Sequence, residues 1–309
     1  MELLYALESI RTPFLDKLMG LVTNLGGEAV FIVAAIVVFW CLNKSCGYYM
    51  MTVGFAGTII NQFLKLWFRI PRPWVKDPNF TIVESARAEA TGYSFPSGHT
   101  QNAVGTFGGI ARATKRHCLR WVCVVIFVLV SFSRMYLGVH TPLDVGVSFV
   151  IAAVLVFAIY PLMRRADRYP RLMAGLLASM VLLSAAYLTF TLVYPFPPDI
   201  DSANLASGVE NGWKLLGATL GIALAWWLDR QYVRFETKAI WWVQAIKFIV
   251  GLALVVALKA GLKAPLIALF GGSAGPAGAV RYFLVVLAAG VLWPMAFRPL
   301  SRLGQRGEG

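Results

Sequence analysis

The chain has 309 residues, of which 58% are hydrophobic and only 14% charged, and its mean hydropathy is +0.68. This composition excludes a soluble globular protein and indicates an integral membrane protein. The formal net charge of +13 is typical of basic residues that set membrane orientation and contact anionic lipid. We prefer that interpretation and expect no nucleic-acid partner.

Nine apolar segments are predicted to cross the membrane, because about 20 apolar residues form a helix long enough to span a bilayer. Within lipid a helix satisfies its own backbone polar groups, so we expect an all-α integral membrane protein. Residues 1–26 carry charges at intervals that leave no continuous apolar run, and we interpret them as an interfacial helix. The predicted spans are residues 27–43, 48–68, 97–113, 119–138, 142–163, 172–194, 212–229, 239–259 and 279–298.

Basic residues gather in alternate connections between these spans, and the positive-inside rule makes those connections cytoplasmic. The connection YPFPPDIDSANLASGVENG (194–212) contains no Lys or Arg and is predicted to lie outside. With nine crossings, the N-terminus is then outside and the C-terminus inside. The cytoplasmic basic residues are Lys44; Arg112, Lys115, Arg116 and Arg120; Arg164, Arg165, Arg168 and Arg171; Arg230, Arg234 and Lys238; and Arg298, Arg302 and Arg306.

The four cysteines lie near the predicted cytoplasmic face, where thiols stay reduced. Cys41 and Cys46 form one C-x4-C pair, and Cys118 and Cys123 form another. Neither pair is accompanied by a cluster of histidines or carboxylates that would complete a metal site. We therefore predict no metal site.

A second set of charged and titratable residues lies at the predicted outer ends of the spans. A charge near the apolar core of a bilayer is costly unless it is paired or faces a polar cavity, so such a set marks a functional site. Arg69 alone is better explained as a side chain that reaches back to the interface. The remaining members are Lys65, Arg72, His99, Arg134, His140 and Asp144.

The segment HTPLD predicts how two of these residues meet. Thr141 is a suitable N-cap and Pro142 a suitable first helical residue, which puts Asp144 at the third helical position. The carboxylate is then within reach of His140, just before the helix. Accepting a proton from one ring nitrogen would fix the tautomer and leave the other nitrogen free to attack.

The segment FPSGHT also reads as a helix start, with Ser97 or Gly98 as the cap. Open backbone N–H groups at such a start attract anions, phosphate above all. Arg72 and Arg134 are suited to grip phosphate oxygens bidentately, and Lys65 adds a point charge. We therefore expect a pocket for a phosphate dianion.

Three ordered segments carry a family resemblance. They are KLWFRIPRP (65–73), PSGH (96–99) and SRMYLGVHTPLD (133–144). They resemble the pattern K-x6-R-P, P-S-G-H and S-R-x5-H-x3-D of the type 2 phosphatidic acid phosphatase family, without a substitution. The resemblance covers residues 27–163.

The resemblance implies roles for individual residues. His140 would be the nucleophile that takes the phosphoryl group as phosphohistidine, with Asp144 orienting it. His99 would protonate the departing alcohol and then activate water. The phosphate would be held by Lys65, Arg72, Ser97, the Gly98 backbone and Arg134. The family works without a metal, so no cofactor is expected.

The predicted spans and the resemblance, which covers residues 27–163, together suggest a domain organisation. Residues 1–26 would be the interfacial helix, 27–163 a five-span phosphatase core, and 164–309 an extension of four further spans. Those spans could shape a lipid portal, form a homodimer face or move the product. Nine spans with an outside N-terminus are similar to the glucose-6-phosphatase and sphingosine-phosphate phosphatase branches.

The expected function is a multi-pass phosphatase of the cell membrane with its active site on the extracytoplasmic face. Its substrate would be a lipid phosphate monoester or diphosphate, and a soluble sugar phosphate stays open as an alternative. The long connection 74–94 overlies the expected pocket and is predicted to contribute to substrate selection.

Three other interpretations stay open. A serine hydrolase using Ser97 lacks the G-x-S-x-G elbow. A vanadate-dependent haloperoxidase shares the three motifs but is soluble. A transporter or lipid scaffold with a retained phosphate pocket would single out Lys247, an ionisable residue within span 239–259. The alternative for Lys247 is a satisfied lysine facing the helix bundle.

Overall fold

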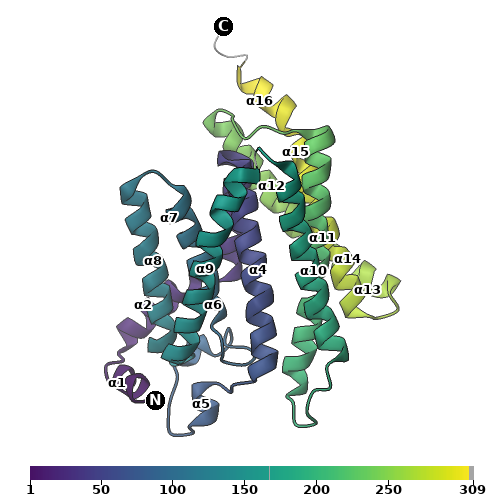
Figure 1. Cartoon of the computed structure of the whole chain (residues 1–309). Helices are drawn as coiled ribbons and strands as arrows, with labels where there is room; N and C mark the ends of the chain where they lie inside the picture. Colours follow the sequence, from purple (N-terminus) through teal and green to yellow (C-terminus); the bar gives the residue numbers. More distant parts are fainter. Residues whose placement is uncertain (167, 306–309) are drawn as a thin grey trace. The chain divides into compact units, whose positions relative to one another are not determined.

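The computed structural model describes residues 1–166 and 168–305, and all regular structure within them is helical (Figure 1). The predicted all-α class is therefore confirmed. The helices are α1 (Glu2–Ser9), α2 (Pro13–Asn24), α3 (Glu28–Val37), α4 (Lys44–Phe68), α5 (Pro73–Lys76), α6 (Gly98–Ala103), α7 (Gly109–Ala113), α8 (His117–Tyr136), α9 (Pro142–Ala166), α10 (Pro170–Val193), α11 (Ser202–Leu228), α12 (Trp241–Gly261), α13 (Lys263–Leu269), α14 (Ala274–Leu287), α15 (Trp293–Met295) and α16 (Phe297–Gln305). Short helical turns lie between them: η1 (Val38–Leu42), η2 (Glu84–Ala86), η3 (Val104–Gly108), η4 (Asp229–Val233) and η5 (Ala288–Leu292).

Five helical segments of the described chain are long and apolar enough to cross a membrane. A sixth is added if α2 and the helix after it form one bent span. The five are residues 117–136, 142–166, 170–193, 241–269 and 274–295. The chain is therefore a membrane-embedded helical protein, and the predicted count of nine spans is not confirmed.

The remaining predicted spans fall short for identifiable reasons. Helices α4 and α11 have 25 and 27 residues, enough to cross a bilayer. Polar residues make them less apolar, among them Asn61 and Gln62 in α4. The predicted span 97–113 is a helical segment of α6, the π-helical turn η3 and α7 that runs only from residue 98 to 113, short of the about 20 residues that a crossing needs.

The chain packs as two compact units that interleave along the sequence. Unit 1 contains residues 1–32, 49–162 and 197–207. Unit 2 contains residues 33–48, 163–196 and those from 208 onward. The connection between α10 and α11 thus belongs to unit 1, although both helices lie mainly in unit 2. These are units of packing, and the predicted domain boundaries stay a prediction.

Unit 1 is organised around α8, which packs against α1, α2, α6 and α7 (Figure 1). The predicted single helix of residues 1–26 is two helices, because Thr12 and Pro13 start a second one. The hydroxyl of Thr12 accepts a hydrogen bond from the amide of Leu15 at 3.3 Å, and proline suits the first helical position. Arg11, between the two helices, donates to the carbonyl oxygens of Tyr136 at 3.0 Å and Thr81 at 2.9 Å. The N-terminal segment therefore braces the end of α8 and the loop after α5.

Unit 2 contains Lys247, which is fully buried on α12. Its ammonium group donates to the carbonyl oxygens of Glu236 at 3.3 Å and Thr237 at 3.4 Å. It also lies 4.7 Å from the centre of the Phe297 ring, a favourable cation–π distance. Lys247 is thus a satisfied lysine, the second of the two interpretations that the sequence left open.

Candidate active site

The start of α9 fixes the carboxylate of Asp144. The amide of Thr141 donates to Oδ2 of Asp144 at 2.8 Å, and the hydroxyl of Thr141 accepts from the amide of Asp144 at 3.3 Å. Helix α9 begins at Pro142, so the predicted cap is confirmed. The same Oδ2 lies 3.5 Å from Nδ1 of His140, and both side chains are only 2% exposed.

The end of α8 places His140. Gly138 follows the helix with a φ of +79°, a left-handed conformation that glycine adopts readily. A Cβ at this position would also lie 2.7 Å from Arg11 and 3.0 Å from the Phe80 ring. The turn lets the amide of His140 donate to the carbonyl of Arg134 at 3.3 Å. The spacing of the S-R-x5-H motif therefore stacks the histidine over the last turn of α8.

Arg72 is held rigidly beside His140. Its Nη2 donates to the carbonyl of Thr91 at 2.6 Å, its Nε to that of Gly92 at 3.0 Å, and its Nη1 to that of Val139 at 3.0 Å. The side chain is 6% exposed. Burial lowers the pKa of Arg72 to about 10, against the opposing effect of Asp144, so the guanidinium stays charged at neutral pH.

The contact between Arg72 and His140 defines a tautomer. Nη1 of Arg72 lies 3.0 Å from Nε2 of His140. Arginine has donors and no acceptor, so Nε2 must carry the lone pair and Nδ1 the proton. That proton faces Asp144. Burial, followed by the charges of Arg72 and Arg134, holds the pKa of His140 well below its usual range, which favours the neutral ring.

Arg134 and Lys65 complete a cationic wall. Arg134 is 1% exposed, and its Nη1 donates to the hydroxyl of Thr23 at 2.6 Å. Its Nε is buried without a hydrogen-bond partner. Lys65 donates to the carbonyl of Tyr93 at 2.5 Å. Leaving the buried Nε of Arg134 without an acceptor costs free energy, and an anion bound between the cations would supply that acceptor.

The PSGH segment meets the S-R-x5-H-x3-D segment through the backbone. Ser97 is the N-cap of α6, and its hydroxyl accepts from the amide of Thr100 at 3.4 Å. The amide of Ser97 donates to the carbonyl of Asp144 at 3.2 Å. Gly98 is the first residue of the helix, next to Ser97. The hydroxyl of Ser97 thus has a capping role, which does not favour a serine hydrolase.

His99 lies close enough to the cations and to His140 to interact with them electrostatically. Its side chain is 18% exposed, and its Nε2 lies 3.2 Å from Oε2 of Glu89. A Cβ at Gly26 would lie 2.9 Å from the carbonyl of His99, so glycine allows the chain after α2 to approach this histidine. All eight predicted site residues therefore gather in unit 1.

Three further residues contact this cluster and were missed by sequence reasoning. Ser94 donates its hydroxyl to Oδ2 of Asp144 at 2.5 Å. Glu89 contacts His99, and Thr23 contacts Arg134. Ser94 and Glu89 lie in an irregular loop, and Thr23 is a single hydroxyl in α2. No periodicity in the sequence marks them.

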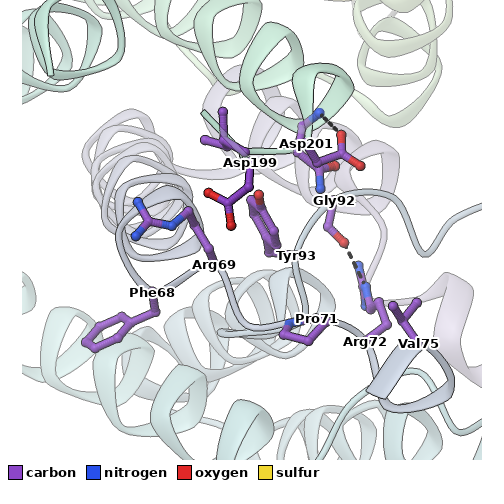
Figure 2. Close-up of a pocket in the computed structure, with 11 residues that line it drawn as sticks. Phe68, Arg69, Pro71, Arg72, Val75, Gly92, Tyr93, Asp199 and Asp201 are labelled. Carbon is purple, nitrogen blue, oxygen red and sulfur yellow. Dashed lines mark hydrogen bonds between the residues drawn. The ribbon is translucent and has the colours of Figure 1, made fainter. Parts of the chain in front are cut away.

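A pocket of about 490 Å³ adjoins Arg72. It is lined by residues of the segments 68–75, 92–93 and 199–204, all within unit 1. Figure 2 shows the carboxylate of Asp199 directed toward Arg69, with Tyr93 beside it. Asp201 is occupied as a helix cap, because its Oδ1 accepts from the amide of Asn204 at 2.8 Å. Arg69 is among the residues that line this pocket. Its backbone φ is +51°, a value unusual for a residue other than glycine.

Metal ligands are not gathered in the described part of the chain, which contains no group of three or more His, Cys, Asp or Glu residues able to hold an ion. All four cysteines are free thiols. The cluster around His140 offers cations and hydrogen-bond donors, which suit an anion.

The family model of the PAP2 superfamily matches residues 45–168, and the model "PAP2 superfamily phosphatase, transmembrane extension" matches residues 213–306. The chain belongs to the PAP2 superfamily. The resemblance to type 2 phosphatidic acid phosphatases is thereby confirmed, and the second match assigns the C-terminal helices to a known extension of the same superfamily.

Curated relatives carry phosphatase names. The probable sphingosine-1-phosphate phosphatase of Dictyostelium discoideum is 28% identical over 243 residues, which cover 73% of this chain and 57% of the relative. Undecaprenyl-diphosphatase BcrC of Bacillus subtilis is 35% identical over 112 residues, 36% of this chain and 55% of the relative. Phosphatidylglycerophosphatase B of B. subtilis is 30% identical over 163 residues, 48% and 76% of the two chains. The chain thus spans less than two thirds of the first two relatives. No solved structure gives a significant match.

Proposed function

We propose that this protein is a metal-independent membrane phosphatase that hydrolyses a lipid phosphate monoester or diphosphate through a phosphohistidine intermediate. The observation that carries the proposal is the chain of contacts from Arg72 to His140 to Asp144. It presents a neutral imidazole whose Nε2 lone pair points to a fixed guanidinium. A phosphate bound by that guanidinium would lie next to the nucleophile.

In the first step, an oxygen of the bound phosphate takes over the hydrogen bond that Arg72 donates to Nε2 of His140, and the freed lone pair attacks phosphorus. The P–N bond forms while the P–O bond to the leaving group breaks, and His99 gives its proton to the departing oxygen. The Nδ1 proton of His140 stays directed at Asp144, which stabilises the positive charge that develops on the ring. In the second step, His99 takes a proton from water, the hydroxyl attacks phosphorus, the P–N bond breaks with its electron pair returning to Nε2 of His140, and phosphate leaves.

Charge neutralisation supports this mechanism because phosphoryl transfer depends mainly on positioning and on stabilising charge on the phosphate oxygens. Lys65, Arg72 and Arg134 supply three positive charges at the site. The partnerless Nε of Arg134 is a donor available to a phosphate oxygen. Ser97 and the backbone amide of Gly98 are assigned to the same phosphate.

The substrate class rests on the relatives, whose names specify sphingosine 1-phosphate, undecaprenyl diphosphate and phosphatidylglycerophosphate. The pocket beside Arg72 provides space for the part of a lipid phosphate next to the ester. Nine spans, an extracytoplasmic site and residence in the cell membrane remain part of the proposal, supported by the distribution of basic residues. A homodimer stays a prediction.

The test is phosphate release by the purified protein from phosphatidic acid, undecaprenyl diphosphate, sphingosine 1-phosphate and glucose 6-phosphate. We expect release from a lipid substrate to survive chelator, to be inhibited by vanadate, and to disappear in His140→Ala. His117→Ala is the matched control, because His117 is exposed at the start of α8. Turnover by His140→Ala would refute the nucleophile, and preference for glucose 6-phosphate would refute the lipid class.

A further inference from the structure

Glu89 makes an ion-pair contact with His99 that lies outside the three motifs. Its Oε2 is 3.2 Å from Nε2 of the imidazole. The Glu89 side chain is 53% exposed and that of His99 is 18% exposed, so the contact is partly open to solvent. Glu89 belongs to the loop between α5 and α6, whose neighbouring carbonyls at Thr91 and Gly92 hold Arg72.

The two histidines of the cluster need opposite protonation states under one positive field. His99 interacts electrostatically with Arg134 on α8, Arg72 before α5 and Lys65 on α4, and also with His140 between α8 and α9. Burial of the rings, followed by this field, favours the neutral form that a nucleophile needs. Both effects disfavour the proton that a general acid must hold until the P–O bond breaks.

The carboxylate of Glu89 places a negative charge next to His99, the histidine that must carry a proton, against the positive charges of Lys65, Arg72 and Arg134. Asp144 faces His140, whereas Glu89 contacts His99 and also acts electrostatically on Arg134. A carboxylate within hydrogen-bonding distance stabilises an imidazolium and fixes the ring orientation. The site therefore contains two carboxylate–histidine pairs with different tasks.

We propose that Glu89 is a positioning residue that orients the His99 ring and stabilises its protonated form during leaving-group protonation. The inference rests on the proposed function, in which His99 is the general acid. With Nε2 held by Glu89, the proton on Nδ1 of the imidazolium passes to the leaving oxygen as the P–O bond breaks and the bond to His140 forms. The pair His99–Glu89 is then neutral imidazole and carboxylate, ready to accept a proton from water.

The decisive experiment compares leaving groups in the Glu89→Gln variant of the full-length protein. An alkyl lipid phosphate needs a proton on its leaving oxygen, whereas p-nitrophenyl phosphate releases a stable phenolate. We expect kcat/KM for the lipid phosphate to fall about 10- to 100-fold and that for p-nitrophenyl phosphate to change less than about threefold. The alkaline limb of the lipid kcat/KM profile should move to lower pH by about one unit, because the acid loses its counter-charge.

Two variants serve as controls. Glu84→Gln removes a carboxylate of the same loop that pairs with Arg87 at 2.8 Å, and it should leave both substrates unaffected. Glu89→Asp keeps the charge and should restore part of the lipid activity. An equal loss on both substrates would reduce Glu89 to a structural loop residue and overturn the proposal.

Unchanged or increased lipid turnover in Glu89→Gln would also overturn the proposal. In that case the Glu89 carboxylate would contact His99 only in the substrate-free protein, at the position that the substrate phosphate takes during turnover. The failure of the proposed function looks different. In that case His140→Ala would retain turnover of both substrates, whatever the leaving-group dependence of Glu89→Gln.

Discussion

Ser94 donates its hydroxyl to Oδ2 of Asp144 at 2.5 Å, which ties the loop before α6 to the first turn of α9. The same oxygen accepts the amide of Thr141 at 2.8 Å and faces Nδ1 of His140 at 3.5 Å. One carboxylate oxygen thus serves as helix cap, loop anchor and partner of the imidazole. Substitutions of Asp144 should therefore separate its effect on protein stability from its effect on the reactivity of His140.

Asp144→Asn should reduce kcat by about 10²- to 10⁴-fold while the protein stays folded. The amide oxygen of asparagine still accepts from Ser94 and Thr141, but its neutral side chain no longer stabilises the charged His140 ring. Thermal unfolding in detergent and phosphate release measure the two effects. Asp144→Ala removes the cap as well and should also destabilise the protein by about 1 kcal/mol. Wild-type turnover by Asp144→Asn would contradict the assigned role.

Arg72→Lys should lower kcat/KM by about 10²-fold or more, although the charge is kept. A lysine amine lacks the planar fork that bonds Thr91, Gly92 and Val139 and faces His140. Steady-state kinetics with a lipid phosphate measure the loss. Arg87→Lys is the matched control, because this exposed arginine pairs with Glu84 outside the pocket, and it should change kcat/KM by less than about threefold. Equal effects of the two variants would show that charge alone matters.

The ring of His140 should remain neutral as the pH falls below 6.5, the ordinary value for histidine. The sign follows from burial and adjacent cations, which lower the pKa of His140, so protonation begins only at a more acidic pH. Imidazole ¹⁵N NMR of the substrate-free protein measures this directly, since the chain has only 3 histidines and single variants assign them. A His140 midpoint at or above 6.5 would contradict the electrostatic account.

Val75→Trp should raise KM for lipid phosphates by about tenfold, because the larger ring fills the pocket beside Arg72. Turnover of p-nitrophenyl phosphate should change little, since the small substrate needs only the phosphate cluster. Lys76→Gln, an exposed neighbour on α5, is the control. An unchanged KM for every lipid tested would exclude this pocket as the place of the substrate.

Lys247→Met should destabilise the protein by about 1–3 kcal/mol without changing the activity of the folded enzyme. The variant leaves the carbonyl oxygens of Glu236 and Thr237 without their donor. Thermal unfolding and lipid phosphate hydrolysis measure both properties, with Lys259→Met on the exposed part of α12 as control. A loss of turnover or transport with unaltered stability would instead assign Lys247 a functional role.

Sequence reasoning succeeds here where structure is local. The cap of α9 depends on Thr141, Pro142 and Asp144, three residues within one turn, and side-chain chemistry alone defines it. The same holds for Ser97 at the start of α6. Membrane embedding and the all-α class follow from composition, because lipid leaves the backbone few alternatives.

Contacts distant in sequence were beyond that reasoning. Arg72 bonds to carbonyls of Thr91 and Gly92, whose positions depend on the path of an irregular loop. Glu89 looks like an ordinary solvated loop residue until the fold brings it to His99. The count of nine spans is not confirmed, because polar residues such as Asn61 make α4 less apolar than the five segments that qualify.

Residues 197–207 lie between the two matched regions, 45–168 and 213–306, and pack in unit 1. They follow the segment that carries all the motifs, yet they supply Asp199 and its neighbours to the pocket wall beside Arg72. A chain shortened after residue 168 would keep every candidate catalytic side chain but lose that wall. The wall of the proposed substrate pocket thus comes partly from a connection that lies outside both matched regions, so lipid preference could be altered there without touching a motif residue.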